Sequence, residues 1–139
     1  MEHYPAGWDL PAYQTSGAAA MDLRNAGRAI RLGSLQRTLV PTGLRIAIPV
    51  GYEGQVRPRS GLATKRGLTL PNTPGTIDSD YRGEILVPMV NLDAEPQTID
   101  HGERIAQLLV APVARFAWDE RAELPETKRG DGGFGSTGR

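Results

Sequence analysis

The stretch QRTLVPTGLRIAIP, residues 36–49, is built from aliphatic and β-branched residues and is interrupted by Pro and Gly. Runs of this kind, bounded by turn residues, are typical of short β-strands. Similar runs follow at YEGQVRP (52–58), GEILVPMVNL (83–92) and RIAQLLVAPV (104–113). Regular short strands separated by turn residues predict an all-β fold, either a barrel or a jelly roll.

The rest of the chain supports one β domain with little helix. Eleven prolines and seventeen glycines are spread over 139 residues, which disfavours long helices. The one helix with a clear start is SGLATKRG (60–67), where we expect Ser60 to be the N-cap. The apolar pattern fades from about Glu123. We therefore expect a single domain over residues 1–122 and a flexible C-terminal arm over residues 123–139.

The overall composition argues against several classes of protein. Sixteen basic residues balance sixteen acidic ones, so the chain lacks the basic excess of proteins that track nucleic acid. It has no cysteine, and its two histidines, His3 and His101, are not spaced as metal ligands. No signal peptide and no apolar run of membrane-spanning length is evident. We expect a soluble, cytoplasmic protein with no nucleic-acid or membrane partner.

The segment RPRSGLATKRG (57–67) is a candidate anion site. A strand is expected to end at Arg59, and free backbone N–H groups at the start of the following helix can bind an anion. The positively charged guanidinium of Arg59 can bind an anion through two hydrogen bonds, and the Ser60 hydroxyl can donate another. Gly61 allows a ligand to approach the backbone closely. The alternative is that Ser60 only caps the helix.

The segment PNTPGTIDSDYRGE (71–84) is a candidate site for a planar base. It reads as the turn of a β-hairpin, whose backbone groups and the amide of Asn72 could pair with a base edge. On an extended chain Asp78 and Asp80 point the same way and Ser79 the other. Two carboxylates on one side suggest a general base or a cation ligand. A solvated turn is the alternative.

Two polar residues interrupt apolar segments elsewhere in the chain. Asp22 lies in AAAMDLRNAG (18–27), and Gln107 lies in GERIAQLLV (102–110). A buried Asp or Gln needs a hydrogen-bonding partner, which a ligand or the protein itself can supply. Each is therefore either a site residue or a satisfied polar group of the core.

Taken together, these stretches resemble the trimeric dUTPases. Five motifs of that family occur in order over residues 17–139, and a match to all five is far more specific than a match to any one. The first motif departs from the family pattern at Ala20, where Gly is common, but keeps Asp22. The motifs are GAAAMDLR (17–24), PRSGLA (58–63), NTPGTIDSDYRGE (72–84), GERIAQL (102–108) and RGDGGFGSTG (129–138).

The resemblance implies a jelly-roll-like β-barrel and a homotrimer with shared active sites. The first four motifs would form the cleft, and the fifth, from a neighbouring chain, would close it. The reaction would convert dUTP and water to dUMP and pyrophosphate with Mg²⁺, which keeps uracil out of DNA and supplies dUMP for thymidylate synthesis. A dCTP deaminase-like enzyme and a nucleotide-sensing regulatory module of the same fold are the alternatives.

The resemblance also implies roles for single residues. Asp78 would be the general base that accepts a proton from the attacking water, and Asp22 would anchor Mg²⁺ indirectly through its water shell. Tyr81 would pack under the deoxyribose, and Phe134 would stack over the uracil. The implied substrate-binding residues are Arg59, Ser60, Gly61, Asn72, Gly75, Thr76, Ile77, Asp78, Tyr81, Leu86, Gln107, Arg129, Phe134, Gly135, Ser136 and Thr137.

Overall fold

The chain folds into short β-strands and one short helix, which confirms the predicted all-β, jelly-roll-like fold. The structure, a computed structural model, describes residues 4–133. In chain order the elements are β1 (Met21–Arg24), β2 (Ile30–Leu32), β3 (Arg37–Pro41), β4 (Tyr52–Pro58), α1 (Ser60–Arg66), β5 (Leu68–Thr69), β6 (Gly75–Ile77), β7 (Leu86–Asn91), β8 (Gln97–Ile99) and β9 (Arg104–Pro112).

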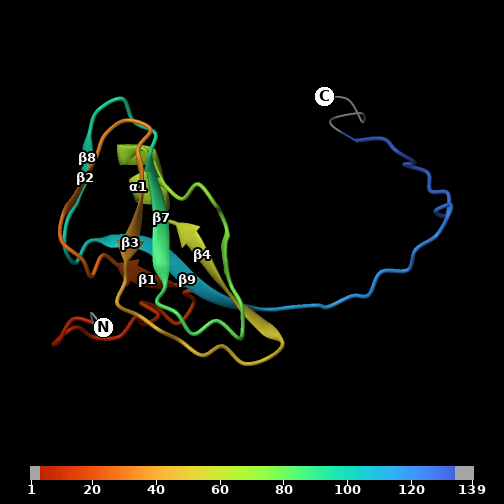
Figure 1. Cartoon of the computed structure of the whole chain (residues 1–139), viewed down its shortest axis with the longest axis horizontal. Helices are drawn as coiled ribbons and strands as arrows, with labels where there is room; N and C mark the ends of the chain where they lie inside the picture. Colours follow the sequence, from red (N-terminus) through yellow and green to blue (C-terminus); the bar gives the residue numbers. More distant parts are fainter. Residues whose placement is uncertain (1–3, 134–139) are drawn as a thin grey trace.

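The strands form three sheets that pack around one core (Figure 1). The largest has the order β1-β9-β4-β6, the second pairs β2 with β8, and the third has the order β3-β7-β5. Every pairing is antiparallel. Within the described residues these sheets are separate and do not close into one ring of hydrogen-bonded strands.

The core explains why these short runs become strands. In β9 the buried residues include Ile105, Ala106, Leu108 and Leu109, because this strand lies in the interior of the largest sheet. Burial of one Leu or Ile side chain stabilises a fold by about 1.5–3 kcal/mol. The largest fully buried apolar side chains are Leu23, Leu68, Met89, Ile99, Ile105, Val40 and Val87.

The run over residues 36–49 is only partly a strand. β3 ends at Pro41, whose ring nitrogen cannot donate a backbone hydrogen bond. The hydroxyl of the buried Thr42 then donates to the carbonyl of Ile85 at 2.7 Å and accepts from the amide of Leu44 at 3.2 Å. The sequence predicted one longer strand here. After Pro41, hydrogen bonds of the Thr42 side chain replace part of the backbone pairing between strands.

The prediction that Ser60 is the helix N-cap is wrong by one residue. Arg59 is the N-cap residue, with extended φ and ψ, and no side chain caps the helix. Ser60 is the first helical residue. α1 ends at Arg66. The C-cap residue, Gly67, has a φ of 61°, the left-handed conformation that favours glycine, and its N–H donates to the carbonyl of Leu62.

The predicted β-hairpin around residues 71–74 is also wrong. β5 pairs with β7 and β6 pairs with β4, so the turn connects two different sheets. The next segment is not extended either, because the amide of Tyr81 donates to the carbonyl of Asp78 at 3.1 Å and closes a turn. The argument that Asp78 and Asp80 share one side of an extended strand therefore fails.

The chain leaves the sheets after β9. Residues 112–131 are exposed, and Figure 1 shows them leading away from the sheets as an extended segment. Phe116 is 78% exposed and Trp118 is 90% exposed, and their rings pack edge to face with centroids 5.2 Å apart. Across residues 4–133, no helix has the length and apolarity that crossing a membrane would require.

Candidate active site

A cavity of about 200 Å³ lies between the third motif, β4 and β7. It brings together seven of the residues implied as substrate-binding, with five others. Its lining residues are Asn72, Gly75, Thr76, Ile77, Asp78, Tyr81 and Leu86, together with Val56, Leu70, Glu84, Ile85 and Pro88. Apolar walls with a few convergent polar groups are typical of sites for small organic ligands.

Pairing of β6 with β4 forms one wall of this cavity. Gly75 lies opposite Val56, and Ile77 lies opposite Gly54. A Cβ at Gly75 would come 3.3 Å from the amide nitrogen of Asn72 and 3.4 Å from the Cβ of Val56. Glycine at this position therefore leaves room for the Asn72 amide, whose donor and acceptor can pair with a polar ring edge.

The turn after β6 holds Tyr81 at the cavity. Its hydroxyl donates to the carbonyl of Glu84 at 2.9 Å, and its side chain is 45% exposed. Arg82 donates to the carbonyls of Ser79 and Tyr81 at 2.8 and 2.7 Å. These bonds fold the turn on itself and leave Tyr81 partly exposed at the cavity.

Asp78 lies between two cavities. It lines the 200 Å³ cavity and also a neighbouring cavity of about 280 Å³, whose wall includes Ser79, Asp80 and Tyr52. Asp78 is an exposed residue, so water can reach it. A carboxylate in this position can accept a proton from a water molecule next to a bound ligand. Asp80 lines only the second of these two cavities.

A second group of implied site residues gathers across β1, β9 and β4. Asp22 lies opposite Gln107, and Gln107 lies opposite Arg57, so the first motif, the fourth motif and the residue directly before the second motif meet in one row of the sheet. Arg59 Nε lies 3.1 Å from Asp22 Oδ1, and Arg104 Nη1 lies 3.1 Å from Asp22 Oδ2. The side chain of Asp22 is only 15% exposed.

The two contacts of Asp22 are not equivalent. Arg104 donates a hydrogen bond to Oδ2, whereas Arg59 Nε is close to Oδ1 but is not aligned for a hydrogen bond. Oδ1 is buried and has no hydrogen-bond partner in the described part of the chain. A buried carboxylate oxygen without a donor is costly, so this atom is suited to accept from a bound group such as metal-held water.

Ser60 and Gly61 lie beside this row, at the start of α1. Both are exposed, and a Cβ at Gly61 would meet nothing within 4 Å, so the space next to its backbone is open. None of the four residues Asp22, Arg59, Ser60 and Gln107 lines the 200 Å³ cavity. A single chain thus presents a base-sized cavity and a separate arginine-rich surface.

The remaining implied residues lie in the C-terminal segment. Arg129 is exposed, and its Nε donates to the carbonyl of Gly132 at 2.7 Å. Phe134, Gly135, Ser136 and Thr137 lie outside the described residues.

Two residues of the site were not singled out from the sequence. Arg104 binds Asp22, and Glu84 lines the cavity while its Oε1 accepts from the amide of Gly43 at 2.7 Å. Both lie inside quoted motifs, GERIAQL and NTPGTIDSDYRGE, so the motif match could have pointed to them. Their partners come from distant parts of the chain, which the motifs do not reveal.

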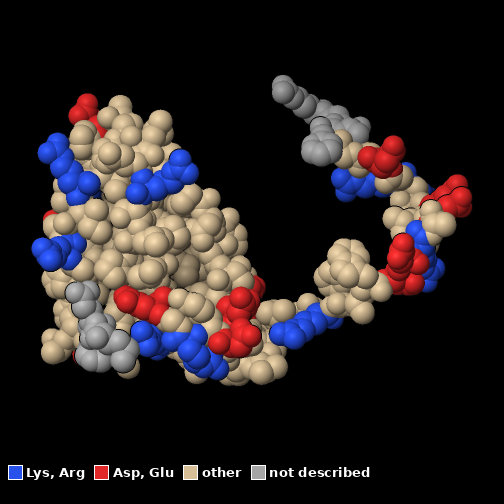
Figure 2. Space-filling view, in the orientation of Figure 1, with Lys and Arg blue, Asp and Glu red and all other residues tan. Residues whose placement is uncertain are grey.

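The described residues contain no cluster of three or more His, Asp or Glu side chains that could hold a metal ion. Figure 2 shows basic and acidic residues in small separate groups on the face that it presents, without one extended basic patch.

Comparisons with known proteins agree with one another. The family described as dUTPase matches residues 6–138. Proteins named deoxyuridine 5'-triphosphate nucleotidohydrolase from Brucella melitensis and Brucella suis are 58% identical over 141 aligned positions, which cover 99% of this chain and 89% of each relative.

Two solved structures have the same fold. A dUTPase from Streptococcus mutans superimposes with a TM-score of 0.73 at 31% identity, over 78% of this chain and 89% of that one. The dUTPase of Staphylococcus bacteriophage 80alpha, solved with dUpNHpp, superimposes with a TM-score of 0.84 at 24% identity, over 99% of this chain and 96% of that one.

Proposed function

Because the chain belongs to the dUTPase family, we propose that it hydrolyses dUTP to dUMP and pyrophosphate by attack of water on the α-phosphorus. The observation that carries this proposal is the 58% identity, over 99% of the chain, to relatives named for this activity. The reaction keeps uracil out of DNA and supplies dUMP for thymidylate synthesis. A dCTP deaminase finds no support in these relatives. Action in the cytoplasm remains a prediction.

The 200 Å³ cavity is proposed to bind uracil and deoxyribose. The amide of Asn72 and the backbone of Gly75, Thr76 and Ile77 would pair with the uracil edge. Cytosine exchanges donor and acceptor at that edge and would leave buried polar groups unpaired, which supports strong discrimination. Tyr81 would pack against the sugar, where its ring leaves no room for a 2′-hydroxyl, and Leu86 would add a backbone contact.

Asp78 is proposed as the general base. Its carboxylate would take one proton from the attacking water while the water oxygen bonds to the α-phosphorus. The bond from that phosphorus to the bridging oxygen breaks, and pyrophosphate leaves with the electron pair. The position of Asp78 between a base-sized cavity and a second open cavity supports this role.

Arg59, Ser60, Gly61 and Gln107 are proposed to bind the phosphates. They lie outside the cavity that would hold the base. This separation supports a homotrimer, in which the cavity of one chain faces the arginine-rich surface of another. The arm, proposed to comprise residues 123–139, would bring Arg129, Phe134, Gly135, Ser136 and Thr137 of a third chain to close the site.

Mg²⁺ is the proposed cofactor, with Asp22 as its indirect ligand. The residues fit such a role, because Asp22 Oδ1 is buried and has no hydrogen-bond partner within residues 4–133. Mg²⁺ keeps several of its waters and binds through few carboxylates and substrate phosphates. When bound, it would neutralise charge on the triphosphate. Asp22 would hold the water shell, and Arg59 and Arg104 would hold Asp22.

Pyrophosphate release tests the proposal directly. The protein is incubated with dUTP, dCTP, dTTP or UTP in Mg²⁺ buffer, and product is measured. We expect turnover of dUTP alone at low substrate concentration, and loss of turnover when a chelator removes divalent metal. Binding of dUTP without pyrophosphate release would instead support a regulatory nucleotide-sensing module, and release of ammonia from dCTP would support a deaminase.

A further inference from the structure

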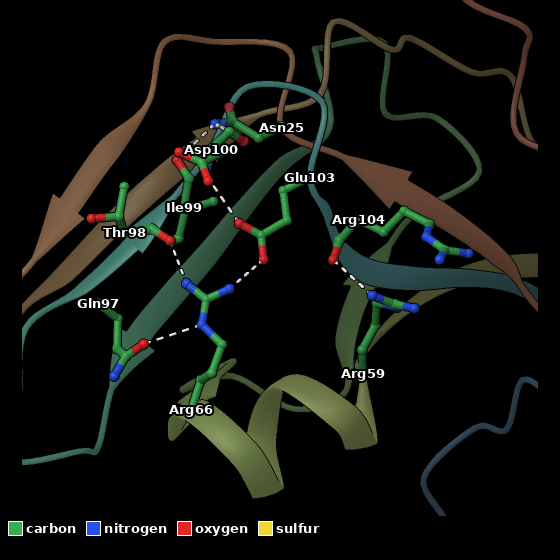
Figure 3. Close-up of polar contacts among 9 residues, drawn as sticks. All are labelled: Asn25, Arg59, Arg66, Gln97, Thr98, Ile99, Asp100, Glu103 and Arg104. Atoms are coloured by element: carbon green, nitrogen blue, oxygen red, sulfur yellow. Dashed lines mark hydrogen bonds and ion pairs between the residues drawn. The ribbon is translucent and has the colours of Figure 1, made fainter.

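Arg66, the last residue of α1, reaches across to the chain that leads into β9. Its Nε donates to the side-chain carbonyl of Gln97 at 3.1 Å, and its Nη1 lies 2.5 Å from Glu103 Oε1. Its Nη2 donates to the carbonyl of Thr98. Figure 3 shows the guanidinium with all three acceptors around it. All three nitrogens of one planar group are thus committed to one segment of the chain.

Glu103 connects Arg66 to the turn before β9. Its second oxygen, Oε2, accepts from the amide of Asp100 at 3.0 Å, so one carboxylate binds both the helix and the turn. The buried side chain of Asn25 holds the turn from the other side, donating to the carbonyl of Asp100 at 3.1 Å. The backbone N–H of Asn25 also donates to the backbone carbonyl of Glu103 at 2.9 Å.

These contacts connect the fourth motif to residues that follow the first and second motifs. Asn25 follows the first motif, Arg66 follows the second, and Glu103 belongs to the fourth. At the other end of α1, Arg59 Nη1 donates to the carbonyl of Arg104 at 3.0 Å (Figure 3). Both ends of the helix are therefore fixed to the segment that carries Glu103 and Arg104.

We infer that Arg66 and Glu103 are positioning residues that hold the proposed phosphate-binding residues of α1 in register with Asp22 and Gln107. Neither has been assigned to the substrate. This inference rests on the proposed binding of phosphates by Arg59, Ser60 and Gly61. Without the Arg66 contacts, α1 would lose its side-chain connection to residues 97–103, and Ser60 could shift relative to Gln107.

The Arg66 contacts are expected to affect catalysis more strongly than stability. The Arg66 and Glu103 side chains are 30% and 20% exposed, so the pair is partly buried and breaking it is also expected to lower the Tm. In contrast, a misplacement of about 1 Å at a reacting group can lower the rate on the order of 100-fold. Lysine cannot reproduce the three-way contact, because its ammonium is a single point donor group without the planar fork.

The test compares Arg66→Met, Arg66→Lys and Glu103→Gln with a matched control, Lys65→Met. Lys65 is exposed on the same turn of α1, and its replacement removes the same charge. For each variant the Tm, kcat and KM for dUTP, and Kd for dUMP and for dUpNHpp are measured. Arg59→Met is included as a variant of the proposed phosphate site itself.

We expect Arg66→Met to lower kcat for dUTP by roughly tenfold or more, with weaker dUpNHpp binding and a Kd for dUMP within about twofold of wild type. Arg66→Lys should recover only part of the loss, and Lys65→Met should match wild type. The double variant of Arg66→Met and Glu103→Gln should be no worse than the poorer single variant, because the two residues act together.

Two results would overturn the inference. One is a kcat/KM for Arg66→Met within twofold of wild type while Arg59→Met is impaired. The other is an equal loss of dUMP and dUpNHpp binding, which would indicate general damage to the fold. If Arg59→Met retains wild-type kinetics, the proposed phosphate site itself is wrong, and that failure is distinguishable from failure of the positioning role.

Discussion

The ring of Tyr81 lies directly against the backbone of Gly83. A Cβ at Gly83 would overlap the hydroxyl and Cζ of Tyr81 and would come within 2.9 Å of Cε2. The hydroxyl is held in this position by its bond to the carbonyl of Glu84. Glycine at residue 83 is therefore needed for the tyrosine to form its part of the cavity wall.

Replacement of Gly83 by alanine is expected to relax sugar selection. The new methyl group would push the Tyr81 ring from its place, and the 2′-hydroxyl of UTP would find room. The UTP-to-dUTP ratio of kcat/KM should rise roughly tenfold or more, since one methyl-sized change in a pocket is worth about 10- to 200-fold. Gly17→Ala is the control, because a Cβ there meets nothing within 4 Å. An unchanged ratio in Gly83→Ala would show that the ring does not select the sugar.

Asn72 and Tyr81 are expected to control different parts of the substrate. Tyr81→Ala should raise the UTP-to-dUTP ratio of kcat/KM and leave the dCTP-to-dUTP ratio unchanged. Asn72→Ala should do the reverse, because it removes the side chain proposed to read the base edge. Both ratios are measured by pyrophosphate release with each variant. If both variants shift the same ratio, base and sugar are not read by separate residues.

The cavity residues could be predicted from the sequence because most of them are close together in it. Seven of the implied residues lie between Asn72 and Leu86, and a short segment that turns back on itself brings such residues together. Three of the four short runs likewise predicted strands in the right places, and the run over residues 36–49 predicted only β3, since aliphatic runs and turn residues are local features. Local pattern was sufficient for these parts.

Other parts depended on contacts between distant residues. The hairpin prediction failed because Leu68 pairs with Asn91 and Gly75 pairs with Val56. The sequence of the turn over residues 71–74 does not indicate which distant strands the flanking residues pair with. The pairing of Asp22 with Arg104 likewise depends on β1 lying beside β9. The separation of the cavity from the arginine-rich surface follows from the same sheet order.

Asp78→Asn is expected to abolish turnover while substrate binding is retained. The amide keeps the size of the carboxylate but cannot accept the proton from water, so kcat should fall by ~10²–10⁴. Kd for dUpNHpp, measured by calorimetry, should change little. Asp80→Asn is the matched control, since Asp80 lies outside the 200 Å³ cavity. Retention of more than a tenth of the wild-type kcat would rule out Asp78 as the base.

Trp118 is expected to report assembly. Trp118 is 90% exposed in the single chain and packs edge to face with Phe116, which is 78% exposed, and exposed aromatic pairs of this kind often mark an interface. In a Trp8→Phe background Trp118 is the remaining tryptophan. We expect blue-shifted emission and reduced acrylamide quenching in the assembled protein relative to the urea-unfolded chain, with a trimer mass by light scattering. Emission of a fully solvated indole in a trimer would place this segment away from the interface.

Truncation after Lys128 tests the proposed role of the fifth motif. The deletion removes Arg129 and the motif residues Phe134, Ser136 and Thr137, and leaves every strand of the described fold intact. Base–aromatic stacking is worth about 1–3 kcal/mol, so loss of Phe134 and the phosphate contacts should lower kcat/KM for dUTP at least ~10-fold. The Tm and the oligomer mass should stay near wild type, because no core residue is lost.

Three full-length variants separate stacking by Phe134 from a general need for the arm. Phe134→Ala should lose most of the kcat/KM for dUTP that the truncated chain loses. Phe134→Leu should be almost as impaired, because leucine keeps apolar volume but has no aromatic face. Phe134→Trp, in a chain with Trp8 and Trp118 replaced by Phe, should change its fluorescence when dUpNHpp is added, because the indole would stack on uracil. A truncated enzyme with wild-type kinetics would contradict the closing role of the arm, even though the motif matches the family.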